Sequence, residues 1–406
     1  MSASRRLLAF VLTTGLSSLA GVLAAPVIIA GAGEYDWGVQ AAIQSAALLF
    51  GVVIAFGWGT TGAAEVASMP SELRPQWYAD SLVSRLYLLC AVYPVMVAVM
   101  TLLNPEHFAL VAVGSAAYTV SSVGASWYFV GQARPDRLLR LDALPQTAGI
   151  VASIGVMLLT GDLVLTVATQ LVFNLTAVLL SAIVVLRDGP GGVRFDWSVR
   201  RAVSRLADQR HAVTNSATTA LYSSAPLLVL NIFAPTAMPL YAMGEKLYRF
   251  ALAAFVPVLQ FTQGWIPERG AQELTSRVSK ALRWTPLVSL IGACCLVALG
   301  PWAASVLSQG QIVLDMGMAL PFAIVLFAVT VGQILGLAIL VPFGKRRTIA
   351  LAPVIGAVLG LPLLIAGAVL FSALGVAWAL AVSELAVVGY LAAVVFRELH
   401  IRRRGA

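Results

Sequence analysis

The chain has 406 residues, of which 60% are hydrophobic and only 11% are charged, and its mean hydropathy is +0.90. A water-soluble fold could not hide this much apolar surface, so the composition excludes a soluble globular protein and predicts an integral membrane protein. The net charge of +8 would fit a nucleic-acid partner, but the basic residues are confined to particular connections, which argues against that partner.

Apolar runs long enough to cross a hydrocarbon core of roughly 30 Å recur from end to end. We predict an all-α polytopic membrane protein with twelve transmembrane helices, at residues 6–30, 38–66, 79–103, 108–131, 143–161, 163–186, 212–233, 239–265, 284–307, 317–343, 349–371 and 374–396. The first run follows Arg5 and Arg6 as a secretory signal would. Its roughly 24 apolar residues exceed the usual signal core of about 7 to 15, so we expect an uncleaved span.

The basic residues predict the orientation of the chain. Of the 26 Lys and Arg residues, 23 fall in alternate connections. The remaining connections carry acids or no charge, and those acids are Glu34, Asp36, Glu106, Asp162 and Asp315. By the positive-inside rule we expect both termini and all basic connections in the cytoplasm. Arg greatly outnumbers Lys and Ala is abundant, which is typical of GC-rich bacteria, so we expect the bacterial plasma membrane.

The longest connection, residues 187–211, divides the chain into an N-terminal six-helix lobe (1–186) and a C-terminal six-helix lobe (212–396), with a basic cytoplasmic tail at 397–406. Because six is even, both lobes would begin on the same side of the membrane. That layout fits a parallel repeat about an axis along the membrane normal.

The central connection contains the amphipathic stretch "DWSVRRAVSRLADQR". Its apolar face comprises Val199, Ala202, Val203 and Leu206, and Arg201 and Arg205 fall on the opposite side. We expect a surface helix that lies against anionic membrane lipids. A helix that only joins the two lobes is compatible with the same pattern.

Neither the cysteines nor the histidines form a recognisable site. Cys90, Cys294 and Cys295 all lie in predicted spans, and His107, His211 and His400 share no ligand spacing. We therefore predict no disulfide framework, no metal site and no cofactor, apart from a proton or sodium ion that could couple to transport.

The segment "YAMGEKLYRF" (241–250) carries the most informative charges. Glu245, Lys246 and Arg249 fall within one 100° arc of the eighth span, and Tyr241 and Tyr248 flank that arc. Gln260 and Gln263 continue the polar stripe toward the cytoplasm. A charged side chain at the centre of a membrane helix costs about 2.5 to 3.5 kcal/mol, so we expect the stripe to face other helices or a water-filled cavity.

Two interpretations of this cluster remain open. Glu245 and Arg249, four residues apart, could form a salt bridge that only neutralises itself in a helix interface. That pair leaves the segment one net positive charge, which a transporter of an anionic substrate would place in a cavity. Glu384, near the middle of the last span, would then be either a counter-ion to Lys246 or a protonatable coupling group.

Other polar residues in the spans are weaker candidates. The seventh span carries Asn215, Thr219, Tyr222 and Asn231, and the second begins with Gln40 and Gln44; these could line a cavity or hold helices together. Arg85 and Asp80, at the cytoplasmic start of the third span, are expected to extend to the membrane interface.

Three stretches carry a family resemblance: "GAGEYDWGVQAAIQSAALLFGVVIAFGWGTTGAAEVA" (31–67), "ASWYFVGQARPDRL" (125–138) and "LYAMGEKLYRFALAAFVPVLQFTQGWIPERG" (240–270). They resemble the Wzx-type polysaccharide flippases of the multidrug/oligosaccharidyl-lipid/polysaccharide exporter superfamily. In the third stretch, Tyr241, Ala242, Glu245, Lys246, Pro257 and Pro267 fall where that family has its counterparts.

The resemblance implies two six-helix lobes around a central cavity that opens alternately to each side. Its substrate would be an oligosaccharide linked to a polyprenyl pyrophosphate, and a glycan polymerase or ligase could be a partner. The sequence departs from many relatives at Ala55 and Ala64, where they have an acid and an Arg. That departure shifts the expected substrate contacts onto the eighth span, at Tyr241, Lys246, Arg249, Gln260 and Gln263. Asn215 of the seventh span is also expected to bind substrate, with Glu245 and Glu384 as coupling or counter-ion groups.

Three other functions compete with a flippase. A cation-coupled drug exporter of the same superfamily would carry organic cations, which Lys246 and Arg249 should repel. A membrane-embedded glycan ligase or polymerase would need a sizeable outer loop with catalytic groups, and every outer connection here is short. A major-facilitator carrier would carry Gly-Asp-Arg-Arg in the loop after the second span, where "SMPSELRPQWYAD" stands instead.

Overall fold

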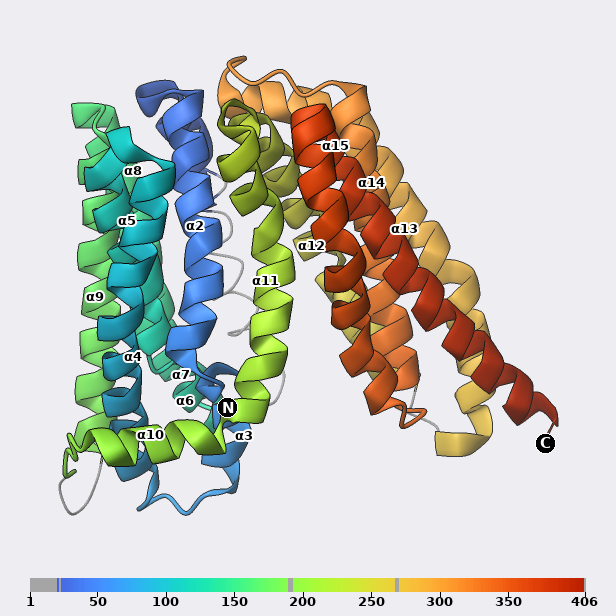
Figure 1. Ribbon diagram of the computed structural model, residues 1–406. Coiled ribbons are helices and arrows are strands. Elements are labelled where there is room, and N and C mark those ends of the chain that lie inside the picture. The colour runs from blue at the N-terminus through green and yellow to red at the C-terminus, as the bar shows by residue number, and fades with distance from the viewer. Residues whose placement is uncertain (1–19, 22, 189–192, 267–269, 405–406) are drawn as a thin grey trace. The chain divides into compact units, whose positions relative to one another are not determined.

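The computed structural model describes residues 20–21, 23–188, 193–266 and 270–404. The described chain divides into two compact units, Met1–Ala220 and Leu221–Ala406, and the division falls inside one helix, α11 (Figure 1). Every regular element in the described ranges is helical. The all-α fold predicted from the composition is therefore confirmed.

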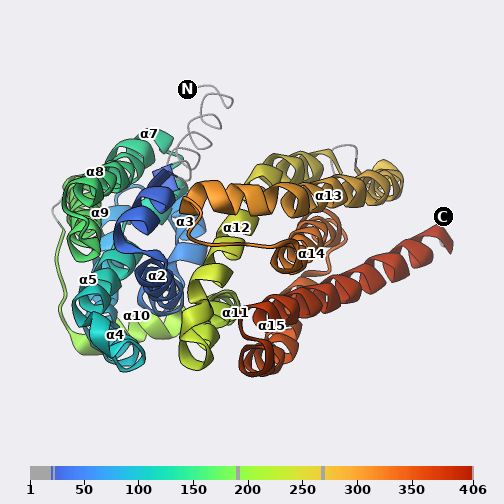
Figure 2. The same ribbon diagram turned by 90° about the horizontal axis from the view of Figure 1, so that it is seen from above.

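The first unit is built from long apolar helices joined by short turns. Its elements are α2 (Glu34–Ala55), α3 (Trp58–Ser68), α4 (Arg74–Leu103), η1 (Pro105–His107), α5 (Phe108–Thr119), η2 (Val120–Val123), α6 (Ser126–Gly131), α7 (Pro135–Leu138), η3 (Leu139–Ala143), α8 (Leu144–Thr160), α9 (Leu163–Arg187), α10 (Val199–Asp208) and the start of α11 (Arg210–Phe233). Seen from above, α5, α8 and α9 lie together (Figure 2). One end of the unit carries the His107–Asp36 contact at 3.0 Å, which joins two of the predicted outer connections.

The second unit has fewer but longer helices. After the remainder of α11 come η4 (Pro235–Ala237), α12 (Met238–Trp265), α13 (Gly270–Ser308), α14 (Met316–Gln333), η5 (Ile334–Leu340) and α15 (Arg346–Arg404). The backbone of α15 breaks at Ser372 (φ 54°, ψ −136°), so α15 is two antiparallel arms. Gly367 and Gly375 allow the arms to meet, because a Cβ on Gly367 would lie 2.5 Å from the carbonyl oxygen of Gly375.

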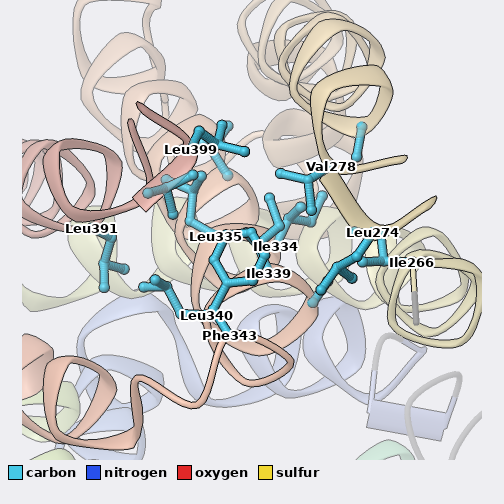
Figure 3. Close-up of a cluster of buried hydrophobic side chains, with 14 of the residues drawn as sticks. Ile266, Leu274, Val278, Ile334, Leu335, Ile339, Leu340, Phe343, Leu391 and Leu399 are labelled. Atoms are coloured by element: carbon cyan, nitrogen blue, oxygen red, sulfur yellow. The ribbon is translucent and has the colours of Figure 1, made fainter. Parts of the chain in front are cut away.

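The core of the second unit gathers where several helices end. Figure 3 shows Ile334, Leu335, Ile339 and Leu340 of η5 at its centre. Side chains from the end of α12, the start of α13 and the end of α15 surround them: Ile266, Leu274, Val278, Leu391 and Leu399. Nearly all of these residues are aliphatic, so they stabilise the unit through close packing.

Nine stretches of the described residues are long and apolar enough to cross a membrane, against twelve predicted. The difference has three sources. The two arms of α15 form one continuous stretch, Arg347–Ile401, that covers the last two predicted spans. Helix α12 is long enough but carries three charges close together. The first predicted span lies mostly outside the described residues, which include only the apolar helix Leu23–Ala32.

Two predicted spans of the first unit are interrupted. The second span breaks between α2 and α3, where Phe56 (φ 42°) and Gly57 (φ 89°) both adopt left-handed conformations. The fourth span breaks at Gly124, after the single turn η2. The two short helices beyond the breaks, α3 and α6, pack closely, because Gly131 places no side chain against the carbonyl oxygen of Ala63.

The placement of Arg85 contradicts the sequence-based expectation that it extends to the membrane interface. Arg85 is fully buried, and its guanidinium donates to the carbonyl oxygens of Gly124 (2.8 Å) and Ser81 (3.2 Å). It also lies over the Trp127 ring, 5.2 Å from its centroid. The break in the fourth span leaves carbonyl groups that no helix satisfies, and a buried guanidinium with five donors supplies the missing partners.

Candidate substrate-binding site

Helix α12 positions the charged cluster within the second unit. Pro239 stands in the first turn, where its missing N–H costs no hydrogen bond. Gly244 lies against α14: a Cβ there would approach Phe322 to 2.1 Å. Tyr241 is fully buried and packs on the same Phe322 ring, with centroids 5.2 Å apart. These contacts fix the rotation of α12 and therefore which of its faces carries the charges.

Glu245 and Arg249 form the ion pair that their spacing allows. The Nε and Nη2 atoms of Arg249 both donate to Oε1 of Glu245, at 2.9 and 2.5 Å. The Glu245 side chain is 11% exposed and that of Arg249 is 49% exposed. The acid is therefore buried beneath the guanidinium, and the guanidinium keeps an open edge that can meet a ligand. Lys246 is half-buried beside the pair.

Tyr241 occupies a different environment from the charged side chains. Its ring is inside the unit, and its hydroxyl has no hydrogen-bond partner among the described residues. The charges of Glu245 and Arg249 still act on it. In this structure Tyr241 therefore supports the interface of α12 with α14, and direct contact with substrate stays a prediction.

A second polar group lies where α11 meets α15. The hydroxyls of Tyr222 and Ser383 are 2.6 Å apart, and both residues are buried. The ring of Tyr222 fits a slot made by Gly356 and Gly360, where added Cβ atoms would lie 3.3 and 2.9 Å from it. Sequence analysis singled out Tyr222 but missed Ser383 and the slot. The Gly-x-x-x-Gly spacing of residues 356–360 was the available signal, since it permits close helix approach.

Glu384 connects this polar group to the charges of α12. It follows Ser383 on the second arm of α15 and is half-buried. Its carboxylate interacts electrostatically with the hydroxyls of both Tyr222 and Tyr248. Tyr248 also interacts with the Glu245–Arg249 pair. The second unit thus places Tyr248 within electrostatic range of Glu384 and of the Glu245–Arg249 pair.

The two glutamines of the predicted site lie apart from this cluster. Gln260 is exposed and Gln263 half-buried. The 11 residues from Arg249 to Gln260 correspond to about 16 Å along α12. These glutamines therefore continue the stripe rather than join the cluster. Asn215 belongs to the first unit, and its side chain is outside the described part of the structure.

The opposite face of α12 borders an apolar cavity of about 450 Å³ shared with α13 and α14. From α12 it is lined by Leu247, Ala251, Ala254, Phe255 and Val258. At 100° per residue these positions lie on the side of the helix away from Glu245 and Arg249. Helix α12 therefore separates a charged surface from an apolar one.

The sequence matches no known family model and no curated protein. Its fold does match solved structures. The lipid II flippase MurJ in an inward closed conformation is 11% identical, with a TM-score of 0.67 over 94% of this chain and 86% of that one. An inward-facing multidrug resistance MATE family transporter of the MOP superfamily is 13% identical, with a TM-score of 0.65 over 97% and 96%. A MATE in the straight conformation is 14% identical, with a TM-score of 0.56 over 98% of this chain and 95% of that one. At these identities the likeness shows that the chain has the fold of these transporters.

Proposed function

We propose that this chain is a flippase that moves a polyprenyl-pyrophosphate-linked oligosaccharide from the inner to the outer leaflet of a bacterial plasma membrane by alternating access. The fold it shares with a lipid flippase and with multidrug transporters supports membrane transport. The observation that carries the choice of an anionic lipid-linked substrate is the charged face of α12. There one buried acid stands beside two basic side chains, and the guanidinium of Arg249 is half exposed.

The physical argument is a balance of charges. A flippase has to bind a pyrophosphate strongly enough to load it and weakly enough to release it. Two cations in a medium of low dielectric constant would hold a multiply charged anion too firmly. Glu245 offsets the charge of Arg249 through their ion pair, which lowers the positive potential of this face.

We propose Glu384 as the residue that couples transport to a proton or sodium gradient, or that acts as counter-ion to Lys246. Its half-buried position beside Tyr222 and Tyr248 supports either role. No other cofactor is proposed. A glycan polymerase or ligase acting on the exported lipid is the expected partner, and both termini are expected in the cytoplasm.

A drug exporter is the second candidate, because the likeness to MATE transporters is almost as high as that to MurJ. The two functions predict opposite charges on the substrate. The basic side chains of α12 favour an anion, and an exporter of organic cations would have to rely on Glu245 and Glu384.

The deciding experiment uses liposomes that contain the purified chain and a polyprenyl-pyrophosphate oligosaccharide with a fluorescent label on the glycan. A membrane-impermeant quencher then reports how much label has reached the outer leaflet. We expect quenching beyond the outer-leaflet share in protein-containing liposomes, and little in liposomes with Lys246→Gln/Arg249→Gln at equal protein content. Absence of flipping, together with gradient-driven uptake of an organic cation, would replace the flippase with the exporter.

A further inference from the structure

The connection between the two predicted lobes presents an apolar surface on the first unit. Phe195, Trp197, Val199 and Val203 are 44, 55, 60 and 58% exposed. The rings of Phe195 and Trp197 stack with centroids 6.2 Å apart. We call these four residues the apolar edge. Large apolar side chains gathered at the surface indicate contact with a partner or a membrane.

The predicted apolar face of this helix is divided between the core and the surface. Ala202 is 2% exposed, and Leu206 packs against the core of the first unit. Val199 and Val203 are therefore the only members of the predicted face that turn away from the core. At 100° per residue, Arg200 and Ser204 lie 100° around the helix from Val199 and Val203, and Arg201 lies on the side opposite Val199.

Three contacts hold this connection against α4. Gln76 exchanges two hydrogen bonds with the backbone of Arg194, at 2.8 and 3.0 Å. The Tyr87 hydroxyl donates to the carbonyl oxygen of Trp197 at 2.7 Å. Arg205 pairs with Asp80 at 2.9 Å. Figure 1 shows α10 lying crosswise at the end of the long helices of this unit.

Helix α4 gives the depth of these contacts in a membrane. If Leu103 marks the outer edge of the hydrocarbon core, the 16 residues back to Tyr87 span about 24 Å and the 23 residues back to Asp80 span about 35 Å. The hydrocarbon core is roughly 30 Å thick. Tyr87 therefore lies just inside its inner boundary and Asp80 just outside. The segment tied to both lies at the interface, where tryptophan side chains are enriched.

The charges at this interface are predominantly positive. Asp196 pairs with Arg201, and Asp80 pairs with Arg205. The N–H of Ser198 and then the charge of Arg201 lower the pKa of Asp196, which keeps it ionised. Within the described residues, the exposed side chains of Arg194 and Arg200 have no ion-pair partner. Two arginines therefore remain to attract negative charge at the depth of the lipid headgroups.

We infer that the connection is a binding site for anionic lipid: the apolar edge enters the acyl region of the cytoplasmic leaflet, and Arg194 and Arg200 bind the phosphates of its headgroups. Amphipathic helices with aromatic and aliphatic side chains on one side and arginines on the other bind membranes in this way. The inference does not depend on the transported substrate, because none of its residues is a proposed substrate contact.

The first test measures the depth of two neighbouring positions. Spin labels at Val203→Cys and Ser204→Cys are compared in the full chain, with Cys90, Cys294 and Cys295 replaced by alanine, in nanodiscs of phosphatidylglycerol and phosphatidylcholine. We expect the label at position 203 to collide preferentially with oxygen and that at 204 with a water-soluble nickel chelate. Equal exposure of both labels to the chelate would overturn the inference. Burial of the 203 label from both reagents would instead reveal a protein partner, including a second copy of the chain, and would also overturn it.

The second test measures selectivity for anionic lipid. Spin-labelled phosphatidylglycerol and phosphatidylcholine compete for the lipid shell of the full chain. An arginine near an anionic surface contributes about fivefold to association, which corresponds to about 1 kcal/mol. Arg194→Gln/Arg200→Gln should therefore lower the preference for phosphatidylglycerol by fivefold or more. The control Arg283→Gln/Arg397→Gln removes the same charge from the second unit. Equal losses in both double variants, or no loss in the first, would contradict the site.

Discussion

Arg249 reaches back one helical turn and donates from both Nε and Nη2 to the same oxygen of Glu245, at 2.9 and 2.5 Å. The acid is 11% exposed and the base 49%. A self-neutralising salt bridge and a substrate-binding base are therefore not exclusive, because the pair leaves part of the guanidinium exposed. Variants of Glu245 and Arg249 show whether the pair has one of these roles or both.

Replacement of the acid should separate these roles. Glu245→Gln removes the charge that offsets Arg249, so we expect tighter binding of lipid-linked glycan and slower release in single-turnover flipping. Because Arg249 is about half exposed, the stability cost should be small, about 1 kcal/mol. A large fall in melting temperature with unchanged substrate affinity would identify the pair as structural only.

Exchange of the two bases should have unequal effects. Lys246→Arg keeps a positive charge and should preserve most flipping. Arg249→Lys loses the planar fork, which can hold Glu245 with one edge and a phosphate with the other, so it should reduce flipping more, by about tenfold if one charge-assisted hydrogen bond to substrate of about 1.5 kcal/mol is lost. Flipping rates at matched protein content check the order, and the reverse order would contradict the assignment.

Neutralisation of Glu384 should affect coupling rather than folding. Glu384→Gln is expected to abolish the dependence of transport on a proton or sodium gradient and to change stability by less than about 1 kcal/mol. Tyr222→Phe is the control, because it removes the hydrogen bond to Ser383 but keeps the acid. Full gradient-dependent transport by Glu384→Gln would exclude the coupling role.

Arg85 should be essential for stability. Arg85→Met leaves the carbonyl oxygen of Gly124 without its donor inside the first unit and removes the side-chain bond to Ser81, at a cost of about 2–5 kcal/mol. Arg205→Gln, which breaks a partly exposed pair with Asp80, should cost no more than about 1 kcal/mol. Thermal unfolding in detergent compares the two. Similar melting temperatures would show that Arg85 is dispensable.

Gly244 should tolerate no side chain. Gly244→Ala places a Cβ 2.1 Å from Phe322, so overpacking should destabilise the protein by about 1–3 kcal/mol. Gly264→Ala on the same helix meets nothing within 4 Å and serves as the control. Phe322→Leu should restore much of the lost stability in the Gly244→Ala background. If it does not, the contact with Phe322 is not the cause.

The sequence alone determined the fold class and the general position of the charges. Composition requires a membrane protein, because a water-soluble fold could not bury so many apolar side chains and a lipid bilayer can surround them. Helical periodicity placed Glu245, Lys246 and Arg249 on one arc, since residues four apart on a helix are neighbours whatever surrounds them. These features are local, so they can be inferred without knowledge of the packing.

Only the tertiary structure decided which polar groups meet across helices. The Tyr222 ring fits against Gly356 and Gly360, and this places its hydroxyl beside that of Ser383. The two glycines precede Ser383 by 27 and 23 residues, a separation that no short-range sequence pattern encodes. Arg85 is buried because the fourth span breaks at Gly124. This break, remote in sequence, leaves a buried carbonyl group without a helical partner, and Arg85 becomes its donor. Val203 and Ala202 share a predicted face but meet different surroundings, because α4 holds the connection at one angle. In each case the free energy depends on contacts between segments far apart in the chain, and these contacts exist only after the helices have packed.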